Sequence, residues 1–213
     1  MNPRFSDALR EASEPDWSAG VAHRFVRELG EGSVAPGVMA SYLVQDHRFL
    51  DDFLGLLGAA IASADTFDAR LRLGRFAGTI AGEENTYFLR AFEALGIDAE
   101  RRIGEPDKAA TRGFRALMRE AAQAGSYPCA IAVLTVAEWL YLEWARRCPY
   151  PRPPHFLHAE WITLHDNAEF GEFVSFLRAE LDRVGPSQAV RVGEFFTRAV
   201  RLERAFFDAA YEG

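Results

Sequence analysis

The chain has 213 residues, of which 49% are hydrophobic and 26% charged, a balance typical of a globular protein that can bury a core around a small-molecule pocket. Its formal net charge of −7, without a basic stripe, argues against nucleic acid or an anionic membrane as a partner. The two cysteines form no Cys-x-x-Cys pair, so they predict neither a disulfide framework nor a structural zinc site.

The beginning of the chain is polar and lacks the apolar segment of a secretion signal. The most apolar stretch, from Tyr127 to Cys148, is interrupted by Glu138 and is too short for a convincing membrane span. We therefore expect a cytoplasmic protein that forms one domain over residues 1–213 and has no membrane partner.

Every long segment has an apolar period near 3.6 residues, and no run of alternating β-branched residues predicts a sheet. We expect an all-α bundle of about eight helices, each of roughly 12 to 28 residues, joined by short loops. Clusters of Gly, Pro and Ser predict the breaks, at residues 30–37, 63–65, 96–106, 125–128, 148–154 and 185–187.

In chain order, an amphipathic helix is expected from Ser18 to Leu29 and a long helix from Pro36 to Ala62. The longest helix is expected from Thr66 to Leu95. Three of its glycines stand four apart on one face, where another helix is expected to approach closely: Gly74, Gly78 and Gly82. A further helix follows from Tyr127 to Cys148, and a rigid Pro-rich connector ends it at residues 149–154.

The helix expected from Tyr127 to Cys148 is apolar almost all round, which predicts that it is buried. Glu138 is the exception, because it occupies a place in the 3, 4, 3, 4 spacing of an inward seam where packing would favour Leu. A carboxylate in that place must be paired, hydrogen-bonded or neutralised, since burying a bare charge is too unfavourable.

Three further carboxylates occupy the same kind of seam position among apolar or aromatic neighbours: Asp46, Glu84 and Glu203. Four such residues predict one central polar cavity inside a helical bundle. Buried carboxylates that meet there perturb each other's pKa values, as an acid–base site requires. Taken alone, Glu84 is explained as readily by the edge of an apolar stripe or by pairing with an arginine. The candidate partners are Arg48, Arg75, Arg201 and Arg204.

Three chemistries found in helical bundles compete for this cavity. A di-iron site needs Glu-x-x-His pairs, and none occurs at the seam carboxylates. Haem ligation by His23, His47 or His165 has no local signature. A metal-free acid–base site for a planar, amine-bearing ligand fits best, because carboxylates accept hydrogen bonds from amines and four aromatic rings are available for stacking: Phe49, Trp139, Tyr141 and Phe206.

The stretch from Tyr42 to Phe53 reads Tyr-Leu-Val-Gln-Asp-His-Arg-Phe-Leu-Asp-Asp-Phe. It resembles the Tyr-x-x-Gln-Asp-x-x-Tyr-Leu-x-x-Phe helix of the TenA/THI-4 proteins, also called thiaminase II, which have the haem-oxygenase-like all-α fold. The similarity continues in order through Glu203-Arg204-Ala205-Phe206-Phe207, so it covers nearly all of the chain.

Members of that family with a catalytic cysteine carry Pro-Cys-x-Trp-x-Tyr in the middle helix. Without a gap between Gly125-Ser126-Tyr127 and Trp161-Ile162, this chain has Ala137-Glu138-Trp139-Leu140-Tyr141 at that place, and Cys129 lies about two turns too early. The chain therefore resembles the TenA-E subgroup, which has Glu instead of the cysteine. By the same register, His165 stands where cysteine-type members have Tyr, and Phe49 replaces the Tyr of the Gln-Asp motif.

The resemblance implies hydrolysis in thiamin salvage, without a cofactor, of 4-amino-5-aminomethyl-2-methylpyrimidine or its N-formyl derivative. The products are hydroxymethylpyrimidine or the deformylated aminopyrimidine. Asp46 matches the family Asp that holds the pyrimidine amine, and Glu203 matches the Glu that transfers protons near the leaving amine. We assign Glu138, as a hypothesis, to general base catalysis on water or to substrate anchoring. The other residues expected to contact substrate are Tyr42, Phe49, Glu84, Trp139, Tyr141, His165 and Phe206.

Two alternatives stay open at this point. One is an oxidative enzyme of the same fold, similar to the cofactorless quinone-cofactor oxidases or the di-iron oxygenases, and the other is a non-catalytic pyrimidine-binding protein. Members of the family associate as homodimers or homotetramers. Three aromatic residues expected at the surface agree with such an assembly: Phe156, Phe170 and Phe173.

Overall fold

The computed structural model describes residues 3–212, which form helices joined by short loops, with no strand in that range. The all-α prediction is therefore confirmed. The helices are α1 (Phe5–Ala12), α2 (Asp16–Val21), α3 (Arg24–Glu31), α4 (Pro36–Ser63), α5 (Phe67–Thr79), α6 (Asn85–Ala94), α7 (Ala99–Gly104), α8 (Ala109–Gln123), α9 (Tyr127–Arg147), α10 (Phe156–His165), α11 (Ala168–Val184) and α12 (Ala189–Ala209). A π-helical turn, η1 (Ile80–Glu84), joins α5 to α6, and a 3₁₀ turn, η2 (Gly185–Gln188), precedes α12.

The predicted boundaries hold best where Pro or Gly marks a break. The long helix from Pro36 ends one residue later than expected, and the helix from Tyr127 ends one residue earlier. The helix expected over residues 18–29 is instead divided into α2 and α3 at Ala22–His23. Ala22 is the C-cap of α2, and His23 is the N-cap of α3, where its ring nitrogen Nδ1 accepts a hydrogen bond from the backbone of Phe25 at 3.1 Å.

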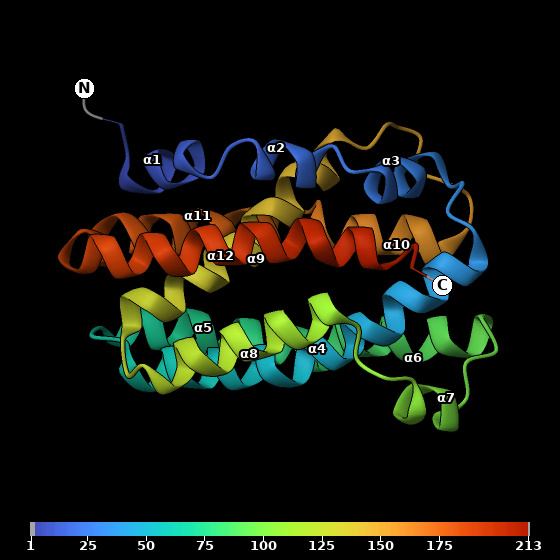
Figure 1. Cartoon of the computed structure of the whole chain (residues 1–213), viewed down its shortest axis with the longest axis horizontal. Coiled ribbons are helices and arrows are strands. Elements are labelled where there is room, and N and C mark those ends of the chain that lie inside the picture. Colours follow the sequence, from blue (N-terminus) through green and yellow to red (C-terminus); the bar gives the residue numbers. More distant parts are fainter. Residues whose placement is uncertain (1–2, 213) are drawn as a thin grey trace.

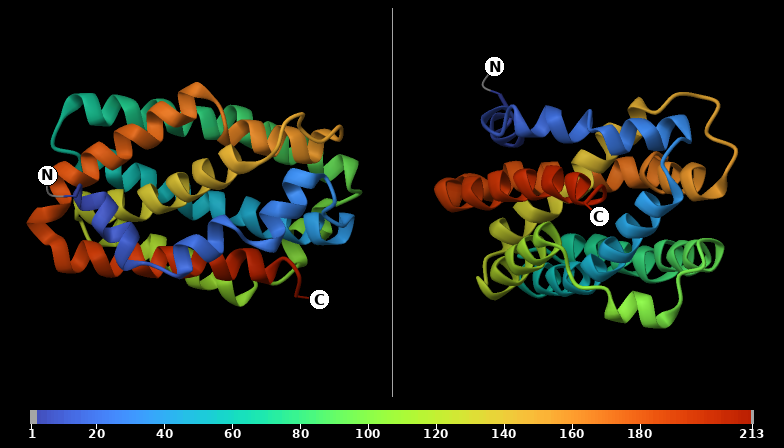
Figure 2. Two further views of the ribbon diagram at one scale, coloured as in Figure 1. Left: turned by 90° about the horizontal axis from the view of Figure 1, so that it is seen from above. Right: turned by 45° about the vertical axis from the view of Figure 1, so that its right-hand side comes forward.

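The helices lie in three layers (Figure 1). α1 to α3 form one outer layer, α11 and α12 form the middle layer, and α4, α5, α6 and α8 form the other outer layer. α9 passes obliquely through the layers and packs against α4, α11 and α12. The right-hand view of Figure 2 shows the same layers. Side chains from every layer can therefore meet beside α9.

α9 is the central core helix. It is long and apolar enough to cross a membrane by length and composition alone, but 94% of its apolar window is buried inside the bundle. Its first turn contains Pro128, and the hydroxyl of Ser126 caps it by accepting from the backbone of Cys129 at 3.4 Å. Burial on all sides explains why its sequence has no polar face.

The glycine face of α5 and η1 packs differently from our expectation. A Cβ atom at Gly74, Gly78 or Gly82 would meet nothing within 4 Å in residues 3–212 apart from its own helix, so no other helix of that range approaches there. The prediction of a close intrachain contact is wrong because this face points outward.

The surface aromatics also differ from the prediction. Phe170 and Phe173 are buried, and Phe156 is half-buried. The ring of Phe173 is stacked on Phe76, with 3.7 Å between their centroids. The rings of Phe76 and Phe173 fill the space between α5 and α11. At the start of α5, by contrast, the side chain of Phe67 is exposed.

Candidate active site

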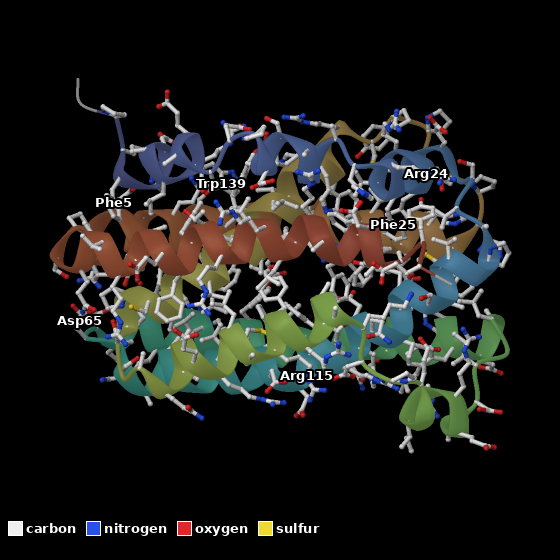
Figure 3. The ribbon with its side chains drawn as sticks, viewed as in Figure 1. Phe5, Arg24, Phe25, Asp65, Arg115 and Trp139 are labelled. Atoms are coloured by element: carbon white, nitrogen blue, oxygen red, sulfur yellow. The ribbon has the colours of Figure 1, made fainter. Side chains whose placement is uncertain are left out.

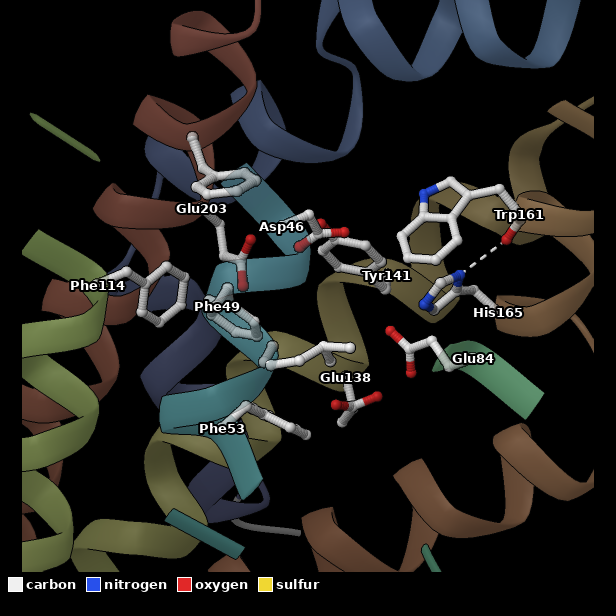
Figure 4. Close-up of a pocket in the computed structure, with 13 residues that line it drawn as sticks. Asp46, Phe49, Phe53, Glu84, Phe114, Glu138, Tyr141, Trp161, His165 and Glu203 are labelled. Carbon is white, nitrogen blue, oxygen red and sulfur yellow. Dashed lines mark hydrogen bonds between the residues drawn. The ribbon is translucent and has the colours of Figure 1, made fainter. Parts of the chain in front are cut away.

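The four seam carboxylates line a single cavity, whose empty volume of about 460 Å³ includes space open to solvent. Figure 4 shows the carboxyl groups of Asp46, Glu84, Glu138 and Glu203 around the same space, each carried by a different helical segment. The other lining residues are Phe49, Leu50, Phe53, Phe114, Ala137, Tyr141, Trp161, His165 and Phe206.

These carboxylates have no cationic partner among residues 3–212. Arg48 pairs with Asp107 at 3.0 Å, and Arg204 pairs with Asp16 at 2.8 Å, so both point away from the cavity. Glu203 is only 2% exposed, and its Oε1 atom has no hydrogen-bond partner in the described chain. A buried acceptor without a donor is unfavourable, and a ligand N–H placed in the cavity would satisfy it.

The surroundings raise the pKa of every carboxyl group in the cavity. Burial raises the pKa of Asp46 to about 7, although its contact with the Tyr42 hydroxyl offsets part of that effect. Burial and the nearby charge of Asp46 raise the pKa of Glu84 to about 8. Burial, together with the neighbouring carboxylates, raises the pKa values of Glu138 and Glu203 well above their ordinary range. Near neutral pH the cluster therefore shares protons, which makes it suited to acid–base catalysis.

His165 presents a hydrogen-bond acceptor to the cavity. Its Nδ1 atom lies 2.8 Å from the backbone oxygen of Trp161, and because a carbonyl oxygen only accepts, Nδ1 carries the proton. Burial lowers the pKa of His165 to about 4, so the ring is neutral at neutral pH and Nε2 keeps its lone pair. The ring centroid lies 4.8 Å from that of Tyr141, which also lines the cavity.

One wall of the cavity is aromatic. The ring of Phe49 packs against those of Phe53, Phe114 and Phe206, with centroids 5.4, 4.9 and 6.3 Å away. Such faces suit a planar heteroaromatic ligand. Phe53 and Phe114 also line the cavity but were not selected from the sequence. In a sequence, an aromatic residue that lines a cavity looks the same as one that packs in the core.

Two of the selected aromatic residues lie outside the lining. The hydroxyl of Tyr42 is 2.6 Å from that of Tyr141, so Tyr42 supports a lining residue from behind. Trp139 faces the other way, toward the layer of α1 and α2 (Figure 3). It packs against Trp17, with 4.8 Å between ring centroids, and the guanidinium of Arg178 lies 3.9 Å from its ring. One residue further along a helix is a rotation of about 100°, which turns Trp139 away from the side that Glu138 occupies. We therefore do not carry Trp139 forward as a substrate contact.

Cys129 also lies away from the cavity. It is fully buried near the start of α9, and its sulfur lies 3.9 Å from the side-chain oxygen of Gln188. No three His, Cys, Asp or Glu side chains of residues 3–212 lie close enough together to hold a metal ion. The donor set that a di-iron site requires is therefore not assembled in the described chain.

Glu84 reaches the cavity from a π-helical turn. η1 inserts between α5 and α6 in a segment that sequence spacing predicts as one regular helix. π-turns of this kind are found mostly as single insertions, often at functional sites. The 3, 4 spacing identifies Glu84 but has no way to show the local widening of the helix that carries it.

Gln45 fixes how α4 faces the cavity. Its side-chain oxygen accepts from the backbone of Lys108 at 2.9 Å and from the hydroxyl of Thr111 at 2.7 Å, and its nitrogen donates to the carbonyl of Pro106 at 3.1 Å. These bonds hold one face of α4 against α8. Asp46 on the adjacent face is thereby directed inward.

The raised pKa values predict how stability depends on pH. Asp46 and Glu84 have ordinary values of 3.8 and 4.5 but values of about 7 and about 8 when folded. The folded state therefore binds these protons more tightly, and the stabilisation is present at low pH and lost as pH rises through about 7 to 8. We expect the double variant Asp46→Asn, Glu84→Gln to gain melting temperature relative to the parent between pH 5 and 9, at roughly 2 to 4 °C per kcal/mol. A difference between the two proteins that is independent of pH would contradict these assignments.

The sequence and the fold of this chain are similar to those of known proteins. The sequence profile of the TENA/THI-4/PQQC family matches residues 10–213. A protein of Halalkalibacterium halodurans named aminopyrimidine aminohydrolase is 26% identical, over 97% of this chain and 95% of its own length. A protein of Bacillus subtilis with the same name is 24% identical, over 98% and 90%. The solved structure of a TenA homologue from P. horikoshii has a TM-score of 0.88 at 22% identity and covers 98% of this chain and 99% of its own, which shows a shared fold.

Proposed function

The chain belongs to the TENA/THI-4/PQQC family, and from this premise we propose that it is a hydrolase of thiamin salvage that acts on an aminopyrimidine. The observation that carries the proposal is a cavity with four carboxyl groups, no cationic partner among the described residues and an aromatic wall. Carboxyl groups in that setting accept hydrogen bonds from amines, while the wall stacks on a planar ring. The names of the relatives from Halalkalibacterium halodurans and Bacillus subtilis support the same substrate class.

In the proposed complex, the pyrimidine ring lies against Phe49 and Phe206, and Asp46 accepts a hydrogen bond from the exocyclic amine. Glu203 offers its unpartnered Oε1 to the amine that leaves. Glu138 stands in the position of the cysteine of other members, and we propose that it acts on water and not as a nucleophile, as in the TenA-E subgroup that the sequence resembles. Tyr141, His165 and Glu84 complete the contacts with the ligand.

The formamide reaction follows directly from these roles. Glu138 removes a proton from water as the C–O bond forms at the formyl carbon. The C–N bond then breaks, Glu203 gives a proton to the departing nitrogen, and the products are formate and the aminomethylpyrimidine. For the aminomethyl substrate, water replaces the amine and the products are hydroxymethylpyrimidine and ammonia. Because no thiolate is present to form a covalent intermediate, departure of the amine in this second reaction depends more strongly on protonation by Glu203.

A mass-spectrometric assay of the pure protein tests the proposed activity. The amine, the formamide and thiamin are incubated separately with the protein, and hydroxymethylpyrimidine, aminomethylpyrimidine and formate are quantified. We expect turnover of at least one of the two aminopyrimidines. A protein that is thermally stabilised by these compounds but turns over none of them would be a binding protein instead.

Asp46→Asn tests the proposed amine contact without catalysis. Loss of the charged acceptor should weaken hydroxymethylpyrimidine binding about tenfold or more, because a hydrogen bond to a charged group is worth roughly 1.5 to 3 kcal/mol. Thermal shift titrations of both proteins measure this difference. Asp51→Asn is the matched control, since that side chain is on the same helix and 86% exposed. Equal affinity of Asp46→Asn and the parent would remove Asp46 from the contact.

We also propose that the protein is cytoplasmic and assembles as a homodimer or homotetramer. Three exposed apolar side chains on α4 and α5 support such an assembly: Leu54, Phe67 and Leu71. Light scattering coupled to size-exclusion chromatography measures the mass. A monomer at micromolar concentration would contradict the proposal.

A further inference from the structure

Lys108 is the only lysine in the sequence, although Lys and Arg together number 24. Its ammonium group donates to three neutral oxygens: the hydroxyl of Ser41 at 2.8 Å and the backbone carbonyls of Ala209 and Glu212 at 2.6 and 2.7 Å. All three N–H donors of the ammonium are thus used. Lys108 forms no ion pair with a carboxylate of the described chain, in contrast to most of the arginines.

The geometry explains why this position holds lysine. The three acceptors come from α4, from the last residue of α12 and from the short segment that follows α12, around a single nitrogen. An ammonium directs three donors tetrahedrally from one atom, whereas a guanidinium spreads its donors in a plane and suits a carboxylate. The carbonyls at a helix C-terminus also carry partial negative charge, so a cation is favourable there.

The same residue links three walls of the cavity. Its backbone N–H donates to Gln45, the neighbour of Asp46 on α4. It directly precedes α8, which carries Phe114. Its ammonium holds Ala209, one turn beyond Phe206 and less than two turns beyond Glu203 on α12. Lys108 itself does not line the cavity.

We propose that Lys108 is a positioning residue of the cavity. Its ammonium holds the last turn of α12 against α4 and the start of α8, and so fixes where Glu203 and Phe206 stand relative to Asp46. The structural part of this inference stands on the three contacts alone, whereas its kinetic consequence rests on the proposed function.

The test uses the full chain with Lys108→Met and, as a control, Arg198→Met. Arg198 pairs with Glu120 and also links α12 to α8, but both side chains are about half exposed. In ¹H–¹⁵N spectra we expect Lys108→Met to move the amide signals of Asp46, Glu203 and Phe206, and Arg198→Met to leave them in place. In kinetics we expect kcat of Lys108→Met to fall about tenfold or more and KM to change less than kcat, because the variant displaces Glu203 and Phe206 without removing either side chain.

Lys108→Arg is the second variant, and it decides the matter if Lys108→Met does not fold. It keeps the charge but lacks the tetrahedral donors, so the same signals should move and kcat should fall in the same direction. Unmoved signals of Glu203 and Phe206 in a folded Lys108 variant would overturn the inference whatever the activity. If the parent protein turns over no pyrimidine, the proposed function fails, and the spectra still decide the role of Lys108.

Discussion

Replacing Glu203 by glutamine lowers kcat on the aminopyrimidine substrates by about 10² to 10⁴-fold, the range expected when one acid–base group is lost. The amide keeps the shape of the side chain but cannot hand a proton to the leaving nitrogen. Burial and the charges of Asp46 and Glu138 raise the pKa of Glu203 well above its ordinary range, which favours the protonated form that this role needs. Steady-state kinetics on both substrates measures the loss.

Glu194→Gln is the control for this experiment. Glu194 lies on the same helix, α12, but is exposed and does not line the cavity. Its kcat should stay within about twofold of the parent, as for surface changes away from a site. If folded Glu203→Gln turned over both substrates at the parent rate, Glu203 would have no part in proton transfer.

Glu138→Gln has the second large effect, and its kinetic pattern separates the two roles considered for this residue. If Glu138 is the base that activates water, kcat falls by about 10² to 10⁴-fold while KM changes little. If it anchors the substrate, KM rises and kcat is less affected. We expect the first pattern, because burial and the charges of Glu84 and Asp46 make the Glu138 carboxylate a stronger base than an exposed glutamate.

The matched control on α9 is Glu143→Gln. Glu143 accepts hydrogen bonds from Arg10 and from the indole of Trp17, at 3.0 and 2.9 Å, on the side facing the N-terminal helices. Its loss should lower the melting temperature without changing kcat. Equal kcat losses in the two variants would mean that Glu138→Gln acts through stability and not through the chemistry.

The sequence was most informative where the helices are regular. Asp46, Glu138 and Glu203 lie on long α-helices with 3.6 residues per turn, so their spacing identified them, and the same spacing identified Glu84, the fourth carboxylate that lines the cavity. A charged residue on an apolar seam is a strong signal, because packing alone would not place it there.

The same spacing was misleading where the local geometry is irregular or the chemistry is ordinary. Trp139 neighbours Glu138 in the sequence but faces the opposite layer. The spacing placed Glu84 correctly in the cavity but did not show that η1 widens the helix that carries it. Gln45 and Lys108 position the site through contacts with residues more than sixty places away, as in the bond between Lys108 and Ser41. Such long-range contacts leave no periodic trace in one sequence.

Hydrolysis in water enriched in heavy oxygen tests the central claim most directly. A hydrolase transfers oxygen from water, so hydroxymethylpyrimidine formed from the amine, or formate formed from the formamide, must gain the mass of one heavy oxygen. Both products should carry no label when the heavy isotope is supplied as dioxygen in ordinary water. Label that enters from dioxygen and not from water would contradict the account and would identify the chain as an oxidative enzyme of this fold.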